Sequence, residues 1–87
     1  MTDCEEIIVC FENVAQAIMA EQALVEKKVD VRVMPTPSSI RAGCGFCLRF
    51  LPEFFKNVIR FLAEQNFFVS EAYCREKAAG SYKKIEL

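Results

Sequence analysis

The sequence contains no histidine, and this absence removes several kinds of site at once. Without histidine there is neither a Cys–His nucleophile pair nor an imidazole ligand for a metal ion. Charge of one sign is also not in excess, because 11 Lys and Arg residues stand against 12 Asp and Glu residues. A nucleic-acid-binding domain would need a clear basic excess on one face, so we do not expect nucleic acid as a partner.

Long apolar runs are missing as well, and no stretch approaches the roughly 20 apolar residues of a membrane span. The first residues, MTDCEE, are acidic, unlike those of a signal peptide. We therefore expect a cytoplasmic protein with no membrane contact. With 87 residues, the chain is expected to form a single domain, 1–87, with a core over about 6–74 and a polar C-terminal tail over about 75–87.

Cysteine, in contrast, is abundant, with five residues at positions 4, 10, 44, 47 and 74. The odd count and the lack of an export signal argue against a secreted disulfide framework, so most thiols are expected to be reduced. Cys10 and Cys74 are expected to be small apolar strand residues, and Cys4 to lie in a frayed terminus. We expect no metal and no cofactor, since a lone CxxC offers two ligands where structural zinc takes four.

Hydrophobic periodicity predicts the regular elements. Glu6–Phe11 is typical of a buried strand, and Asn13, with Gln16 three residues later, is typical of a helix N-cap. The helix is expected to end near 27–28, and its predicted inner stripe comprises Val14, Ala17, Ile18, Leu24 and Val25. Alternation then predicts strands over 29–34 and 46–50. A helix is expected from Pro52 to Asn66, with an inner stripe of Phe55, Val58, Ile59 and Leu62, and a last strand over 67–74.

This order, β-α-β-β-α-β, predicts an α+β fold, the ferredoxin-like sandwich with a four-stranded antiparallel sheet and both helices on one face. The other face of the sheet would be left open. Alternation along the third strand places Cys47 and Arg49 on that open face, opposite Phe46, Leu48 and Phe50. A homodimer formed through the open face is a reasonable hypothesis.

Cys44 is the candidate for chemistry. Gly43 and Gly45 flank it and free the backbone, and exposed N–H groups of this turn would stabilise an anion. Arg41 and Arg49 bracket it, and a guanidinium near the sulfur would favour the reactive thiolate. The residues therefore fit a nucleophilic or group-carrying thiol, although a simple turn with a solvated arginine is equally compatible with them.

Cys44 and Cys47 also form a CxxC, which we interpret separately. In thioredoxin-like proteins this motif opens a helix after a strand, whereas here it leads into a strand. Cys47 would act as a resolving thiol if it released a persulfide by forming a Cys44–Cys47 disulfide. The other interpretation, which we favour, is that Cys47 is a small strand residue.

The segment from the first strand into the second helix resembles a family of small prokaryotic proteins described as selenium/sulfur (Se/S) carrier protein-like. The resemblance covers roughly residues 6–74 and rests on a Met-Pro-x-Pro loop followed by Cys-Gly…Leu-Arg-Phe. The matching positions are Met34, Pro35, Pro37, Ser39, Cys44, Gly45, Leu48, Arg49 and Phe50. The position of Cys47 is usually a small residue in that pattern, so the CxxC is a departure from it.

The resemblance implies that Cys44 holds sulfur or selenium as a persulfide-type adduct, taken from a donor protein and passed to an acceptor protein. Such a chain would be a carrier more than a self-sufficient enzyme, since no carboxylate pair or histidine accompanies the thiol. Two alternatives remain open at this point: a non-catalytic binding or regulatory module that uses the open sheet face, and a thiol-disulfide redox protein that uses Cys44 and Cys47.

Overall fold

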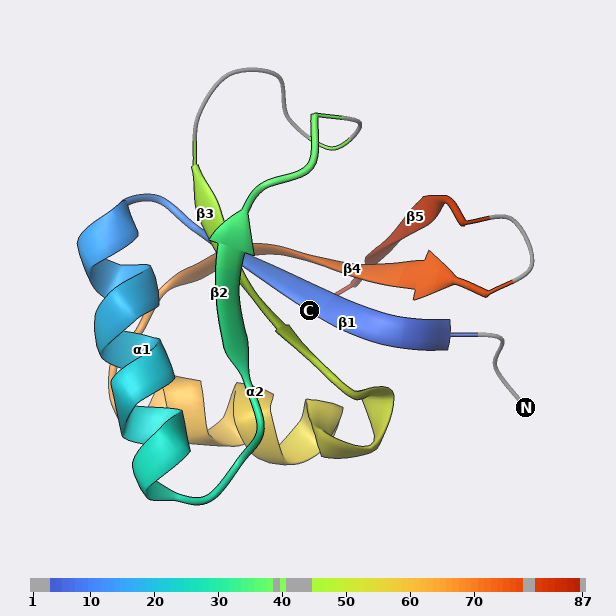
Figure 1. Cartoon of the computed structure of the whole chain (residues 1–87). Helices are drawn as coiled ribbons and strands as arrows, with labels where there is room; N and C mark the ends of the chain where they lie inside the picture. Colours follow the sequence, from blue (N-terminus) through green and yellow to red (C-terminus); the bar gives the residue numbers. More distant parts are fainter. Residues whose placement is uncertain (1–3, 39, 41–44, 78–79, 87) are drawn as a thin grey trace.

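Two helices and a five-stranded sheet make up the fold (Figure 1). The computed structural model of the chain describes residues 4–38, 40, 45–77 and 80–86. In chain order the elements are β1 (Cys4–Phe11), α1 (Val14–Glu26), β2 (Arg32–Pro35), β3 (Phe46–Phe50), a 3-10 turn η1 (Pro52–Phe54), α2 (Phe55–Glu64), β4 (Val69–Glu76) and β5 (Tyr82–Ile85).

The strands lie in the order β2-β3-β1-β4-β5, and all neighbouring pairs are antiparallel. The predicted α+β class is confirmed, but the four-stranded ferredoxin-like sandwich is not matched, because part of the expected polar tail forms β5. This strand pairs with β4, from Ala72 opposite Ile85 to Arg75 opposite Tyr82. The connection between β4 and β5 contains Gly80 with φ 67°, a value that glycine adopts without strain. The two lysines within β5 break the apolar pattern by which a strand is recognised in the sequence.

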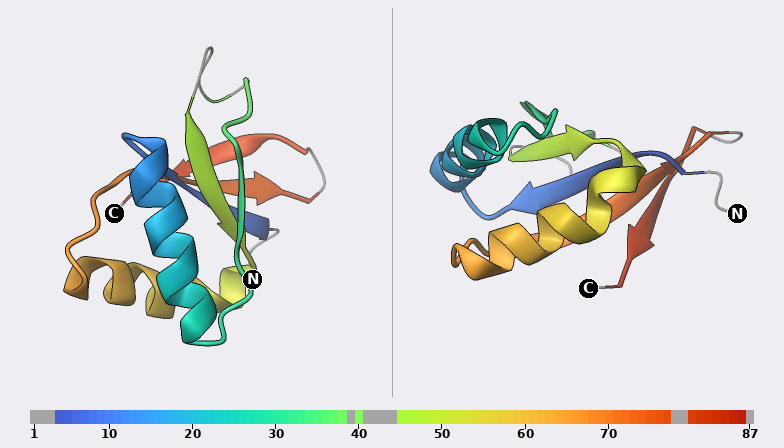
Figure 2. Two further views of the ribbon diagram at one scale, coloured as in Figure 1. Left: turned by 60° about the vertical axis from the view of Figure 1, so that its left-hand side comes forward. Right: turned by 90° about the horizontal axis from the view of Figure 1, so that it is seen from below.

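Both helices pack on one face of the sheet, as predicted (Figure 2). The main core joins this face of β1 to the buried stripe of each helix. Its buried members include Ile7, Val9, Phe11, Ala17, Ala20, Leu24, Leu48, Val58 and Leu62.

The predicted inner stripe of α1 is only partly right. Ala17 and Leu24 are buried, but Val14, Ile18 and Val25 are 44%, 43% and 53% exposed. The stripe that faces the sheet passes through Ala20 instead, since two small alanines let the helix approach the strands closely.

The start of α1 is capped as expected. The Asn13 side chain accepts a hydrogen bond of 2.8 Å from the Gln16 N–H. The Gln16 side chain does not return to Asn13, and its oxygen accepts from the Phe68 N–H at 3.3 Å, which ties the start of α1 to the chain just before β4. In the described part of the chain, neither α1 nor α2 is long and apolar enough to cross a membrane.

Candidate functional site

The candidate segment leaves the sheet at the end of β2 and returns to it as β3. Its base is closed by a 3.0 Å hydrogen bond, which the Thr36 N–H donates to the Gly45 carbonyl oxygen. Gly45 has φ 135°, a conformation that side chains rarely adopt, and a Cβ there would lie 3.3 Å from Thr36 Oγ1. The glycine is therefore required by the backbone. Three further candidates, Arg41, Gly43 and Cys44, lie outside the described residues.

Cys47 and Arg49 face away from the helices, as alternation along β3 predicted. Cys47 nevertheless has no exposed surface, because a second, smaller cluster covers it on this side of the sheet. The buried members of the cluster are Ile8, Cys10 and Cys47, and the half-buried side chains packed on them are Met34, Tyr73 and Tyr82. The centre of the open face is thus closed by the chain's own side chains.

Cys10 and Cys47 lie directly opposite each other on β1 and β3. The Cys47 thiol contacts the Met34 carbonyl oxygen at 3.6 Å and is hydrogen-bonded to Cys10. The hydrogen bond with Cys10 and the burial of the sulfur raise the pKa of the Cys47 thiol far above its usual range. Cys47 is therefore held as a neutral thiol, which is a poor nucleophile.

Alkylation with iodoacetamide checks this assignment. In the folded protein we expect Cys47 to react slowly, with a rate that does not rise from about pH 7 to about pH 9, across the ordinary thiol pKa. The same thiol in guanidinium-unfolded protein is the control, and its rate should rise steeply over that range. Peptide mass spectrometry measures the labelling of Cys47 in each sample, and fast labelling of Cys47 in the folded protein would contradict its burial.

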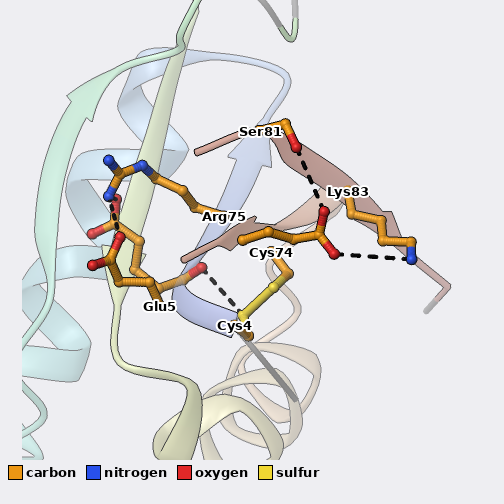
Figure 3. Close-up of a disulfide and its surroundings, with 8 residues drawn as sticks. Cys4, Glu5, Cys74, Arg75, Ser81 and Lys83 are labelled. Atoms are coloured by element: carbon orange, nitrogen blue, oxygen red, sulfur yellow. Dashed lines mark hydrogen bonds and ion pairs between the residues drawn. A yellow bond between two sulfur atoms is a disulfide. The ribbon is translucent and has the colours of Figure 1, made fainter. Parts of the chain in front are cut away.

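Cys4 and Cys74 form a disulfide between β1 and β4 (Figure 3). The expectation that Cys4 lies in a frayed terminus is therefore wrong, and Cys4 and Cys74 are exceptions to the expectation that most thiols are reduced. Strict alternation would place Cys4 with Ile8 and Cys10 on the open face. A β-bulge between Cys4 and Glu6 shifts the register, and Cys4 instead packs beside Cys74 at the edge of the main core.

The family model described as "Putative Se/S carrier protein-like" matches residues 6–74 of the chain. The chain belongs to this Se/S carrier-like family. The matched region runs from β1 into β4 and contains the whole candidate segment. No curated protein matches the chain, and no solved structure matches it.

The motif shared with the Se/S carrier-like family ends in Leu-Arg-Phe, and these three residues have different structural roles. Leu48 and Phe50 are buried in the main core. Arg49 lies on the other face, where its guanidinium is 3.5 Å from the Glu6 carboxylate, which Arg75 also approaches at 3.8 Å. The charge of Arg49 is thus shared with Glu6, and a partly exposed pair of this kind contributes at most about 1 kcal/mol to stability.

Sequence reasoning missed two pairings in this family member, Cys4 with Cys74 and Cys10 with Cys47. Each joins β1 to a strand far along the chain, so sequence spacing gives no sign of it. The register of the predicted central strand against β3 would have found the second pair. Among the described residues, no three Cys, Asp or Glu side chains cluster in a way that would hold a metal ion.

Proposed function

We propose that this chain carries sulfur or selenium as a persulfide-type adduct on Cys44 and passes it to an acceptor protein. The observation that carries the proposal is the match to the Se/S carrier-like family over residues 6–74, a span that includes Cys44. Donor and acceptor proteins are the partners that such a role requires.

The placement of the other cysteines supports Cys44 as the carrier. Cys4 and Cys74 are bonded to each other, while Cys10 and Cys47 are buried beneath the open face. Neither pair offers an accessible thiolate in the folded protein. Four of the five cysteines are thereby accounted for, and Cys44 is the fifth.

The residue that follows this thiol is held at the base of the segment. Gly45 immediately follows Cys44 and is held by Thr36 across the base, next to the first residue of β3. The chain therefore re-enters the sheet at a defined point. In this proposal Arg41 and Arg49 stabilise the anionic adduct. Arg49 lies opposite Arg32, at the other end of the β2–β3 ladder from Gly45, so its ion pair with Glu6 must open for it to do so. Cys47 serves as a buried packing residue and not as a resolving thiol.

The test is to incubate the protein with a small-molecule persulfide and to map the added sulfur by peptide mass spectrometry. We expect one extra sulfur on Cys44 in the wild type and none on that peptide in Cys44→Ser. Cyanide should then remove it as thiocyanate, which reports a transferable sulfur. Cys47→Ala is the matched control and should load normally.

Two outcomes would contradict the proposal. One is a wild-type protein without sulfur on the Cys44 peptide. The other is loading that disappears in Cys47→Ala while that variant stays folded, because the chemistry would then require both thiols of the CxxC.

A further inference from the structure

The Cys4–Cys74 disulfide forms part of the wall of an open pocket of about 460 Å³. The pocket lies between the ends of β1, β4 and β5 and the start of α2. Ile7, Phe55 and Ile85 contribute apolar surface, and both disulfide sulfurs belong to half-buried residues. One water occupies about 30 Å³ of the liquid, so a small solute has ample room to approach the S–S bond.

Charges around the disulfide are distributed unevenly (Figure 3). Lys83 lies directly opposite Cys74 in the β4–β5 ladder, and Glu76 lies opposite Cys4 in the β1–β4 ladder. Both charged residues line the pocket, with Lys83 Nζ 4.0 Å from Glu76 Oε2. Lys84 lines the pocket as well, so its charged lining holds two ammonium groups and one carboxylate, and this net positive charge favours the approach of an anion to the disulfide.

We propose that this pocket is a second chalcogen site, in which a hydrosulfide or hydroselenide anion is captured by the Cys4–Cys74 disulfide. The inference rests on the proposed function for the kind of cargo, but it uses a different pair of cysteines. Cys44 would receive chalcogen already at the persulfide level, whereas the disulfide receives the fully reduced anion.

The capture step balances without a further reagent. The anion attacks one sulfur of the disulfide, for example Cys4 Sγ, a chalcogen–sulfur bond forms, and the S–S bond breaks with its electron pair going to the other sulfur, in this case Cys74 Sγ. The proton of the incoming anion passes through solvent to the Cys74 thiolate. The incoming chalcogen is oxidised and the disulfide is reduced, so Cys4 carries the persulfide or selenosulfide anion and Cys74 becomes a thiol.

Release is the reverse reaction. The Cys74 thiolate attacks Cys4 Sγ, expels the hydrochalcogenide and restores the disulfide. The chain's own disulfide supplies and recovers the oxidising equivalents, so capture and release need no external oxidant.

The experiment uses oxidised Cys44→Ser protein, which keeps the disulfide and lacks the first carrier site. The protein is exposed anaerobically to sodium sulfide or to selenide, trapped by alkylation and mapped by peptide mass spectrometry. We expect one chalcogen on either Cys4 or Cys74 and one alkylated thiol on the other. Removal of the sulfide by desalting before trapping should restore the disulfide.

Lys83→Gln tests the pocket itself. Loss of one of the two cations that line the pocket should slow capture of the anion roughly threefold to tenfold. Lys28→Gln, which makes the same charge change at the far end of α1, should leave the rate unchanged. Cystine in solution gives the rate of an unassisted disulfide, which the protein should exceed.

The inference is overturned if neither Cys4 nor Cys74 gains a chalcogen. It is also overturned if Lys83→Gln reacts as fast as wild type. The Cys4→Ala/Cys74→Ala variant, loaded with a small-molecule persulfide, reports on Cys44 separately. Failure there concerns the proposed function, and failure in Cys44→Ser concerns the disulfide site.

Discussion

Replacing Cys4 and Cys74 by alanine is expected to lower the free energy of unfolding by about 4 kcal/mol, because the disulfide closes most of the chain into a loop. The two cysteines are 70 residues apart in sequence, and restricting so long a loop removes much conformational freedom from the unfolded chain. Small domains are stable by only about 5–15 kcal/mol. Loss of this cross-link should therefore produce a large shift in the urea midpoint.

Dithiothreitol provides the control for this prediction. It should destabilise the wild type to the same level as Cys4→Ala/Cys74→Ala and have no further effect on that variant. Cys10→Ala, which removes a cysteine outside the disulfide, should respond to dithiothreitol as the wild type does. If the urea midpoint of the wild type were the same with and without dithiothreitol, although the disulfide was shown to be reduced, the stabilising role of the disulfide would be contradicted.

Leu48→Ala is expected to lower the free energy of unfolding by about 2–5 kcal/mol. Leu48 has no exposed surface and lies between Val9 of β1 and Val33 of β2 in the sheet. Truncation would leave a cavity in the middle of the main core, where the surrounding strands have little freedom to collapse.

Denaturation in urea measures this effect, with two variants for comparison. Leu48→Met keeps most of the volume and should cost less than about 1.5 kcal/mol. Arg49→Gln, one residue further along and on the other face, should cost less than about 1 kcal/mol. A result in which Arg49→Gln is the more damaging would mean that packing is not what this part of the family motif provides.

Local signals in the sequence predicted much of the fold. The Asn13 cap, the alternation of β3 and the helix that follows Pro52 each depend on residues close to one another in the chain. Alternation also placed Cys47 and Arg49 on the correct face. β5 was missed because its four residues, Tyr-Lys-Lys-Ile, have a weak pattern and obtain their pairing partner from β4.

The environments of the cysteines depend on the register between strands far apart in the chain, which the sequence did not reveal. The bulge after Cys4 reverses the face that alternation assigns to it, and no residue type announces a bulge there. Burial of Cys47 depends on Met34, Tyr73 and Tyr82, which come from three other strands. The expectation for Cys44 rests on family resemblance and on its glycine neighbours, and it stays a prediction.

The bulge in β1 also separates two kinds of sulfur chemistry within a small protein. Cys4 and Cys74 lie on the helix side of the sheet, and Cys10 and Cys47 lie on the opposite side. The hydrogen-bonded backbone of the sheet separates the two pairs of cysteines. Thiol-disulfide exchange between the pairs therefore requires β1 to detach from its neighbouring strands. Mixed disulfides such as Cys4–Cys10 would consequently form only in molecules whose sheet has transiently opened, and their presence would report that opening.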